Sequence, residues 1–142
     1  MSVCPPRSER PRPGRTLARL AALALALACA PAAWAAPERV VSINLCTDQL
    51  ALMLAGPGQL LSVSRMAQDP RSSPMAEAAA ALPGNAARAE DVYLYRPDIV
   101  LAGTFTSRAT VSMLRRLGVE VVELPPVTGL DDIPDRLARV GA

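Results

Sequence analysis

Short β-branched runs alternate with helical patterns from residue 38 onward, and this alternation constrains the fold of the 142-residue chain more than any other feature. Strand-like runs are predicted at 39–43, 60–64, 98–102 and 119–124. Helices are predicted at 75–81, 89–95, 107–117 and 131–140, and another between Asn44 and Gly56. Apolar strands separated by helices favour an α/β fold. We expect one doubly wound lobe, with a parallel sheet of about four strands covered by helices.

The first 35 residues have the three-part pattern of a secretory signal peptide. Five arginines, at 7, 10, 12, 15 and 19, precede an apolar run at 20–30, and the A-x-A site Ala33–Ala35 follows that run. The apolar run is shorter than the roughly 20 residues that a membrane-spanning helix needs. We therefore predict cleavage after Ala35, export to the periplasm, and a mature lobe at 36–142. The alternative is a lipoprotein anchored through Cys29, although Ala26 stands three positions before it instead of leucine.

Charge and composition exclude several functions. Removing residues 1–35 leaves ten arginines and twelve acidic residues, so the predicted mature chain carries a formal charge of −2. Aromatic residues make up only 3% of the sequence, and a nucleic-acid partner has no support. The sequence contains no histidine and no lysine, which excludes His-based nucleophile pairs and a Walker A lysine. Neither GxSxG nor CxxC occurs. No catalytic site is predicted.

Polar or flexible residues follow the predicted strands, where ligands bind to open parallel sheets. The candidate ligand-binding residues are Asn44, Leu45, Arg65, Met66, Thr104 and Phe105. An arginine can pair with a carboxylate or phosphate of a ligand, and a phenyl ring can form an apolar wall. The acidic residues at 131, 132 and 135 fit a helix start, so no metal site is predicted.

Four sequence blocks resemble a known family. Arg39–Asn44 leads into Thr47-Asp48, Gly58–Ser64 follows, and Glu90-Asp91 precedes Arg96–Val100. The fourth block is LRRLGVEVV at 114–122. In this order they are similar to the amino-terminal lobe of periplasmic substrate-binding proteins of ABC importers for iron–siderophore, haem and cobalamin. Leu45 stands where the family has proline.

The resemblance implies a non-catalytic, monomeric transport protein without a resident cofactor, whose cargo is a metal chelate. It also implies that Glu90, with Asp91 beside it, docks onto arginines of the membrane permease. Family members have a second lobe and a connecting helix, which residues 1–142 do not include. We therefore expect either a fragment or a truncated product. The identity of the chelate, siderophore, haem or corrinoid, stays open.

One alternative function stays open as well. A small exported enzyme or redox domain could use Cys46 or an acidic pair, although we expect Cys46 to be a small buried residue. Tyr93 and Tyr95 are expected in the core.

Overall fold

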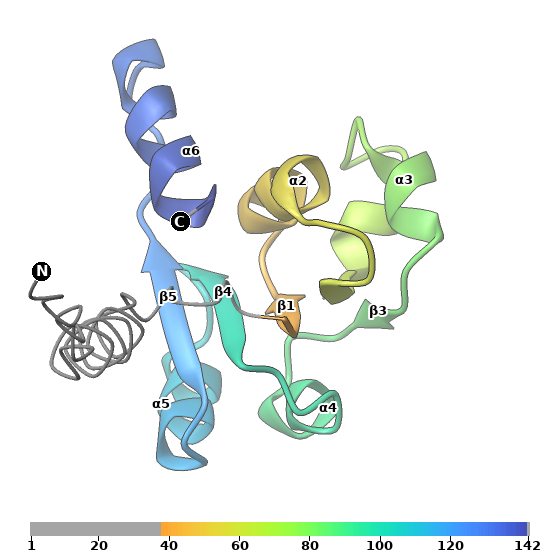
Figure 1. Cartoon of the computed structure of the whole chain (residues 1–142), viewed down its shortest axis with the longest axis vertical. Helices are drawn as coiled ribbons and strands as arrows, with labels where there is room; N and C mark the ends of the chain where they lie inside the picture. The colour runs from red at the N-terminus through yellow and green to blue at the C-terminus, as the bar shows by residue number, and fades with distance from the viewer. Residues whose placement is uncertain (1–37, 142) are drawn as a thin grey trace, which may run out of the picture. The chain divides into compact units, whose positions relative to one another are not determined.

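The computed structural model describes residues 38–141, and a five-stranded parallel sheet lies at their centre (Figure 1). The strands are β1 (Val40–Ser42), β2 (Leu60–Ser64), β3 (Gly84–Asn85), β4 (Ile99–Gly103) and β5 (Glu120–Leu124). Their order in the sheet is β3-β2-β1-β4-β5, and all pairs are parallel. The predicted α/β lobe is confirmed.

Helices cover both faces of this sheet. On one face lie α2 (Leu45–Leu54), α3 (Ala76–Ala80) and α6 (Ile133–Gly141), and on the other lie α4 (Ala89–Tyr93) and α5 (Arg108–Arg116) (Figure 1). Two 3₁₀ turns complete the chain, η1 (Arg65–Gln68) after β2 and η2 (Leu130–Asp132) before α6. Because side chains alternate along a strand, each face of the sheet has its own core.

Neighbouring residues of the same strand belong to different cores. Val41 and Val100 belong to the core under α4 and α5, where Leu114 is completely buried. Val40 and Leu101 belong to the core under α2 and α3.

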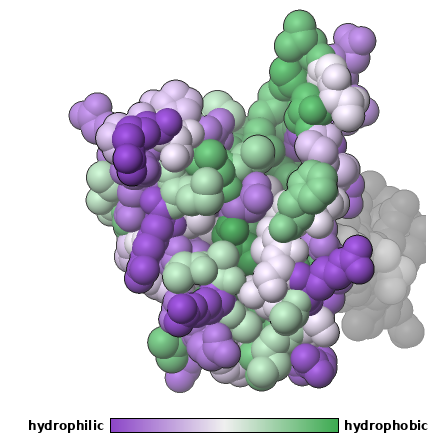
Figure 2. Space-filling view, turned by 180° about the vertical axis from the view of Figure 1, so that it is seen from behind, coloured by the Kyte–Doolittle hydropathy of each residue, from purple (hydrophilic) through white to green (hydrophobic). Residues whose placement is uncertain are grey.

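Apolar side chains are also exposed before and at the start of α6 (Figure 2): Val127, Leu130 and Ile133.

The prediction of about four strands missed β3. This strand has only two residues, pairing Val63 with Gly84 and Ser64 with Asn85. A Gly-Asn dipeptide has low β propensity, so tertiary pairing alone makes it a strand. The last helix also begins later than predicted, because η2 occupies 130–132. The predicted signal peptide at 1–35 and Cys29 lie outside the described residues.

A reciprocal clamp joins the amino ends of β1 and β4. The backbone N–H groups of Glu38 and Arg39 donate to Oδ2 of Asp98, at 3.1 and 3.0 Å. The Arg39 guanidinium in turn donates to the carbonyls of Tyr95 and Arg96. These contacts give a structural reason for the Arg39 and Arg96-Pro97-Asp98 blocks of the sequence.

A buried carboxylate ties α2 to β2. Asp48 is completely buried, and its Oδ1 accepts a hydrogen bond from the Ser64 backbone N–H at 3.1 Å. The Ser64 hydroxyl also donates to this carboxylate. Burial raises the pKa of Asp48 above its ordinary value, and hydrogen bonds from Ser42 and Ser64 oppose that rise.

Within 38–141, no helix combines the length and hydropathy needed to cross a bilayer.

Candidate functional site

A cavity of about 420 Å³ opens at the carboxyl ends of β1, β2, β3 and β4. From β1 the chain passes to α2 on one face of the sheet, and from β4 it passes to α5 on the other face (Figure 1). The cavity therefore lies at the topological switch point, where open α/β sheets bind ligands. Its lining residues are Ile43, Asn44, Leu45, Cys46, Ser64, Arg65, Met66, Asn85, Ala86, Ala87, Thr106 and Ser107.

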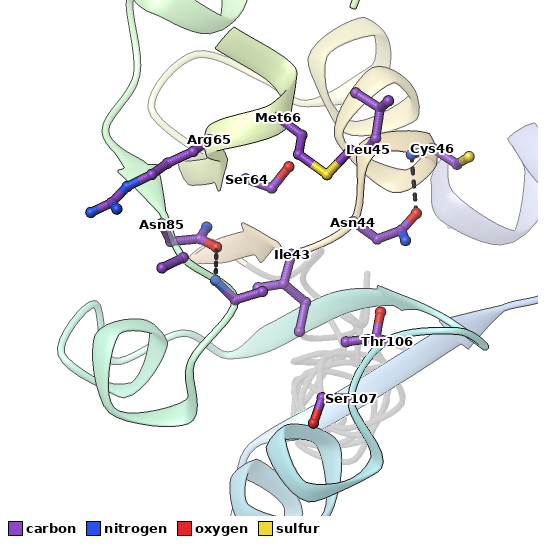
Figure 3. A pocket seen from close by; sticks show the side chains of 12 residues that line it. Ile43, Asn44, Leu45, Cys46, Ser64, Arg65, Met66, Asn85, Thr106 and Ser107 are labelled. Atoms are coloured by element: carbon purple, nitrogen blue, oxygen red, sulfur yellow. Dashed lines mark hydrogen bonds between the residues drawn. The ribbon is translucent and has the colours of Figure 1, made fainter. Parts of the chain in front are cut away.

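Asn44 lines the cavity as the N-cap of α2. Its Oδ1 accepts a hydrogen bond from the Cys46 backbone N–H at 3.0 Å (Figure 3). Its side chain lies against Gly103, where an added Cβ would come within 2.9 Å of Asn44 Cγ. Glycine at 103 therefore makes room for the cap.

The turn η1 brings Arg65 and Met66 to the cavity. The Met66 side chain points across the cavity toward Leu45, whereas the Arg65 guanidinium points away from Asn44 (Figure 3). Arg65 also lines a second hollow of about 300 Å³, which includes Asp91. Gly84 lies against this turn: a Cβ there would come within 2.4 Å of Gln68 Oε1 and within 3.2 Å of Arg65 Cγ. The cavity thus presents a thioether, with the guanidinium at its side.

A short wall formed by Ala86 and Ala87 follows β3. Ala87 has a φ of 54°, a left-handed conformation that is uncommon for a residue with a Cβ. The Ala87 backbone N–H donates to Asn85 Oδ1 at 3.0 Å, and Thr110 Oγ1 donates to the Ala87 carbonyl at 3.1 Å. Sequence reasoning missed this wall because it missed β3.

The turn after β4 contributes Thr106 and Ser107. The Gly103 N–H donates to Thr106 Oγ1 at 3.1 Å, and the Thr106 N–H donates to the Gly103 carbonyl at 2.9 Å. Thr104 and Phe105 lie in this turn but do not line the cavity, and the Phe105 side chain is 87% exposed. Of the six predicted ligand-binding residues, Asn44, Leu45, Arg65 and Met66 come together at the cavity.

The predicted docking residues lie on α4. Glu90 and Asp91 occupy its first turn, Glu90 exposed and Asp91 half-buried. The expectation of a buried Cys46 is wrong, because this residue is exposed and lines the cavity. Tyr95 packs partly buried against the core as predicted, whereas Tyr93 is 44% exposed.

The chemistry of the cavity suits a ligand that is partly apolar. Ile43, Leu45 and Met66 offer apolar surface, and Asn44 is a polar neighbour. The helices α2 and α5 begin at the cavity, and their amino ends favour negative over positive charge. In residues 38–141, no group of three or more His, Cys, Asp and Glu residues could hold a metal ion.

Solved structures of periplasmic binding proteins resemble this lobe. A periplasmic haem-binding protein from Pseudomonas aeruginosa is 26% identical, with a TM-score of 0.61 over 75% of this chain and 38% of that chain. The periplasmic vitamin B12-binding protein BtuF of Vibrio cholerae is 25% identical, with a TM-score of 0.55 over 75% of this chain and 42% of that chain.

A third similar structure is described as a possible iron-binding, periplasmic solute-binding protein from Staphylococcus epidermidis. It is 17% identical, with a TM-score of 0.61 over 74% of this chain and 41% of that chain. This third likeness concerns the fold alone. No family model matches the chain, and no curated protein matches it in sequence.

These comparisons define the class of fold. The described chain has the α/β architecture of one lobe of a periplasmic solute-binding protein. It resembles the haem- and vitamin B12-binding members in sequence as well, at 26% and 25% identity. The chain spans about two fifths of the length of these solved proteins, which are 38% and 42% covered.

Proposed function

We propose that the chain is an exported, non-catalytic substrate-binding component of an ABC importer, and that its cargo is a metal chelate. The observation that carries this proposal is the cavity at the switch point between β1 and β4, in a lobe that resembles haem- and vitamin B12-binding proteins. Haem, a corrinoid and an iron–siderophore are the three candidate cargoes.

The side chains around the cavity support such a cargo. Large metal chelates have broad apolar surfaces with a few polar groups at the edge. Leu45 and Met66 face each other across the cavity, and Asn44 lies beside them (Figure 3). Phe105 lies outside the cavity lining, but it is exposed on the turn next to Thr106 and offers a further apolar contact to a cargo that extends beyond the cavity. The metal would arrive within its chelate, which agrees with the finding that residues 38–141 contain no group of three or more His, Cys, Asp and Glu residues that could hold it.

Titration of residues 36–142 with hemin, cyanocobalamin and ferrichrome tests this proposal. One lobe buries only part of such a ligand, so we expect dissociation constants in the high-micromolar range for the cargo that fits. Met66→Glu places a charge in the cavity and weakens binding of that cargo at least about tenfold.

Met53→Glu is the matched control. Met53 is 59% exposed and Met66 is 57% exposed, but Met53 lies near the carboxyl end of α2 and does not line the cavity. The control should bind like the unchanged chain. Equal weakening by both substitutions, or no binding of any of the three probes, contradicts the proposal.

Glu90 and Asp91 are the proposed contact with the permease. Both stand in the first turn of α4, and an exposed carboxylate can form bidentate hydrogen bonds with an arginine. The double substitution Glu90→Arg and Asp91→Arg should abolish capture by the permease in vesicles without changing hemin or cyanocobalamin affinity. Glu77→Arg is the control, because Glu77 is also exposed in the first turn of a five-residue helix. Undiminished capture of the double variant contradicts this assignment.

A further inference from the structure

The wall formed by Ala86 and Ala87 depends on a buried amide. We infer that Asn85 is a positioning residue, which holds this wall in the shape that selects the cargo. The inference rests on the proposed function for the cargo, but the geometry of the wall can be measured without any ligand.

All three hydrogen bonds of the Asn85 side chain go to protein atoms. Its Nδ2 donates to the Ser42 carbonyl and to Ser62 Oγ, both at 2.9 Å. Its Oδ1 accepts from the Ala87 N–H at 3.0 Å. The residue is only 3% exposed, although it is among the residues that line the cavity. Asn85 therefore acts on a ligand through the wall, because both of its donors are already engaged.

The neighbours determine the orientation of this amide. A backbone carbonyl such as that of Ser42 can only accept, so the group facing it must be the NH₂ of Asn85. The Ser62 hydroxyl donates to the Pro83 carbonyl at 2.9 Å, so it accepts from the same NH₂. Oδ1 consequently faces the Ala87 N–H. Contacts with β1 and β2 thus hold Oδ1 of Asn85, a hydrogen-bond acceptor, in position facing the cavity wall.

This acceptor offsets an unfavourable backbone conformation. At a φ of 54°, the Cβ of Ala87 lies close to backbone oxygen, which alanine normally avoids. Two hydrogen bonds oppose relaxation, one from the Ala87 N–H to Asn85 and one from Thr110 Oγ1 to the Ala87 carbonyl. Without the hydrogen bond from its N–H to Asn85, Ala87 can rotate out of the left-handed conformation. Loss of this bond should therefore make the wall mobile.

Two substitutions distinguish an effect of Asn85 on the wall from an effect on the stability of the sheet. Asn85→Ala removes the acceptor, so the wall is released. Asn85→Asp keeps an acceptor for the Ala87 N–H but turns an oxygen toward the Ser42 carbonyl. We expect Asp to lower the melting temperature and to preserve the wall. A purely structural role predicts that Asp is at least as harmful as Ala in every measurement.

The first measurement is amide hydrogen exchange by NMR on residues 36–142 without ligand. The Ala87 amide should exchange about five- to tenfold faster in Asn85→Ala, as expected for loss of one hydrogen bond. It should stay protected in Asn85→Asp. Ser73→Ala is the control, because Ser73 is also a buried polar residue but lies outside the cavity lining. Unchanged Ala87 exchange in Asn85→Ala, or lost protection in Asn85→Asp, overturns the inference.

The second measurement is affinity for hemin and cyanocobalamin. Asn85→Ala should weaken binding of the preferred probe about five- to tenfold, and adding Ala87→Gly should recover part of that loss without recovering the melting temperature. Glycine adopts the left-handed conformation without help, so recovery identifies the wall as the cause. An affinity of Asn85→Ala equal to that of the unchanged chain overturns the selecting role. If hemin, cyanocobalamin and ferrichrome all fail to bind the unchanged chain, the proposed function is contradicted, and the exchange measurement then decides the role of Asn85 alone.

Discussion

Replacing Gly103 by alanine should remove the N-cap of α2 by displacing a single neighbour, the Asn44 side chain. The added Cβ would lie 2.9 Å from both Cγ and Nδ2 of Asn44, closer than van der Waals contact allows. The Asn44 side chain must then rotate away, which breaks its hydrogen bond to the Cys46 N–H. Loss of an N-cap of this kind costs about 1 kcal/mol of unfolding free energy.

The same substitution has an opposite contribution from the unfolded state. Alanine restricts the unfolded chain more than glycine does, which stabilises the folded state by about 0.4–1 kcal/mol where the backbone is compatible. Gly103 is not among the glycines with positive φ, so alanine fits its backbone. In an Asn44→Ala background the clash is absent, and Gly103→Ala should therefore be stabilising.

A double-mutant cycle isolates the clash. Urea unfolding, followed by far-UV circular dichroism, should give a coupling of about 1 kcal/mol between positions 44 and 103. With a urea dependence of about 2 kcal/mol per molar, this coupling corresponds to about 0.5 M in the unfolding midpoint. Independent mutations usually add to within about 0.3–0.5 kcal/mol, so a coupling no larger than this would refute the reasoning.

Three further predictions concern the core, a buried carboxylate and the exposed thiol. Leu114→Ala should lower the unfolding free energy by about 2–5 kcal/mol, measured by urea unfolding, because Leu114 is completely buried between α5 and the sheet. Burial raises the pKa of Asp48, so the folded chain binds this proton more tightly than the unfolded chain does, and stability should fall as pH rises from 3.8 through the raised value. Asp48→Asn should remove that fall in a pH series of melting temperatures, and an unchanged slope would contradict it. The Cys46 thiol of residues 36–142 is exposed and should react with a chromogenic disulfide no faster when folded than in urea, whereas a much faster folded reaction would favour the enzyme alternative.

The sequence predicted the elements that have strong local signals. The β-branched runs at β1, β2, β4 and β5 are all strands in the structure. The turn residues Asn44 and Ser107 cap the helices that follow them, as their side chains allow. Four of the residues predicted at strand ends, Asn44, Leu45, Arg65 and Met66, line the cavity, and their role in ligand binding stays a prediction.

The remaining part of the site depends on contacts between distant residues. β3 exists because Gly84 and Asn85 pair with β2, and the cavity wall exists because Asn85 reaches Ser42 on β1. Neither contact leaves a periodic signal in the sequence. Thr104 and Phe105 were assigned by their place after β4, but the tight turn between Gly103 and Thr106 puts them outside the cavity lining.

The position of β1 in the middle of the sheet determines when the cavity can form during folding. Val40 pairs with Leu60 on one side and with Ile99 on the other, so the second partner emerges long after the first. Pairing between such distant segments is slow, and an unpaired apolar strand edge invites pairing with other chains. Until β4 pairs with it, the Val40–Ser42 edge is open to a second unfolded copy. Aggregation during biogenesis should therefore depend most on conditions that delay the closing of β1 against β4.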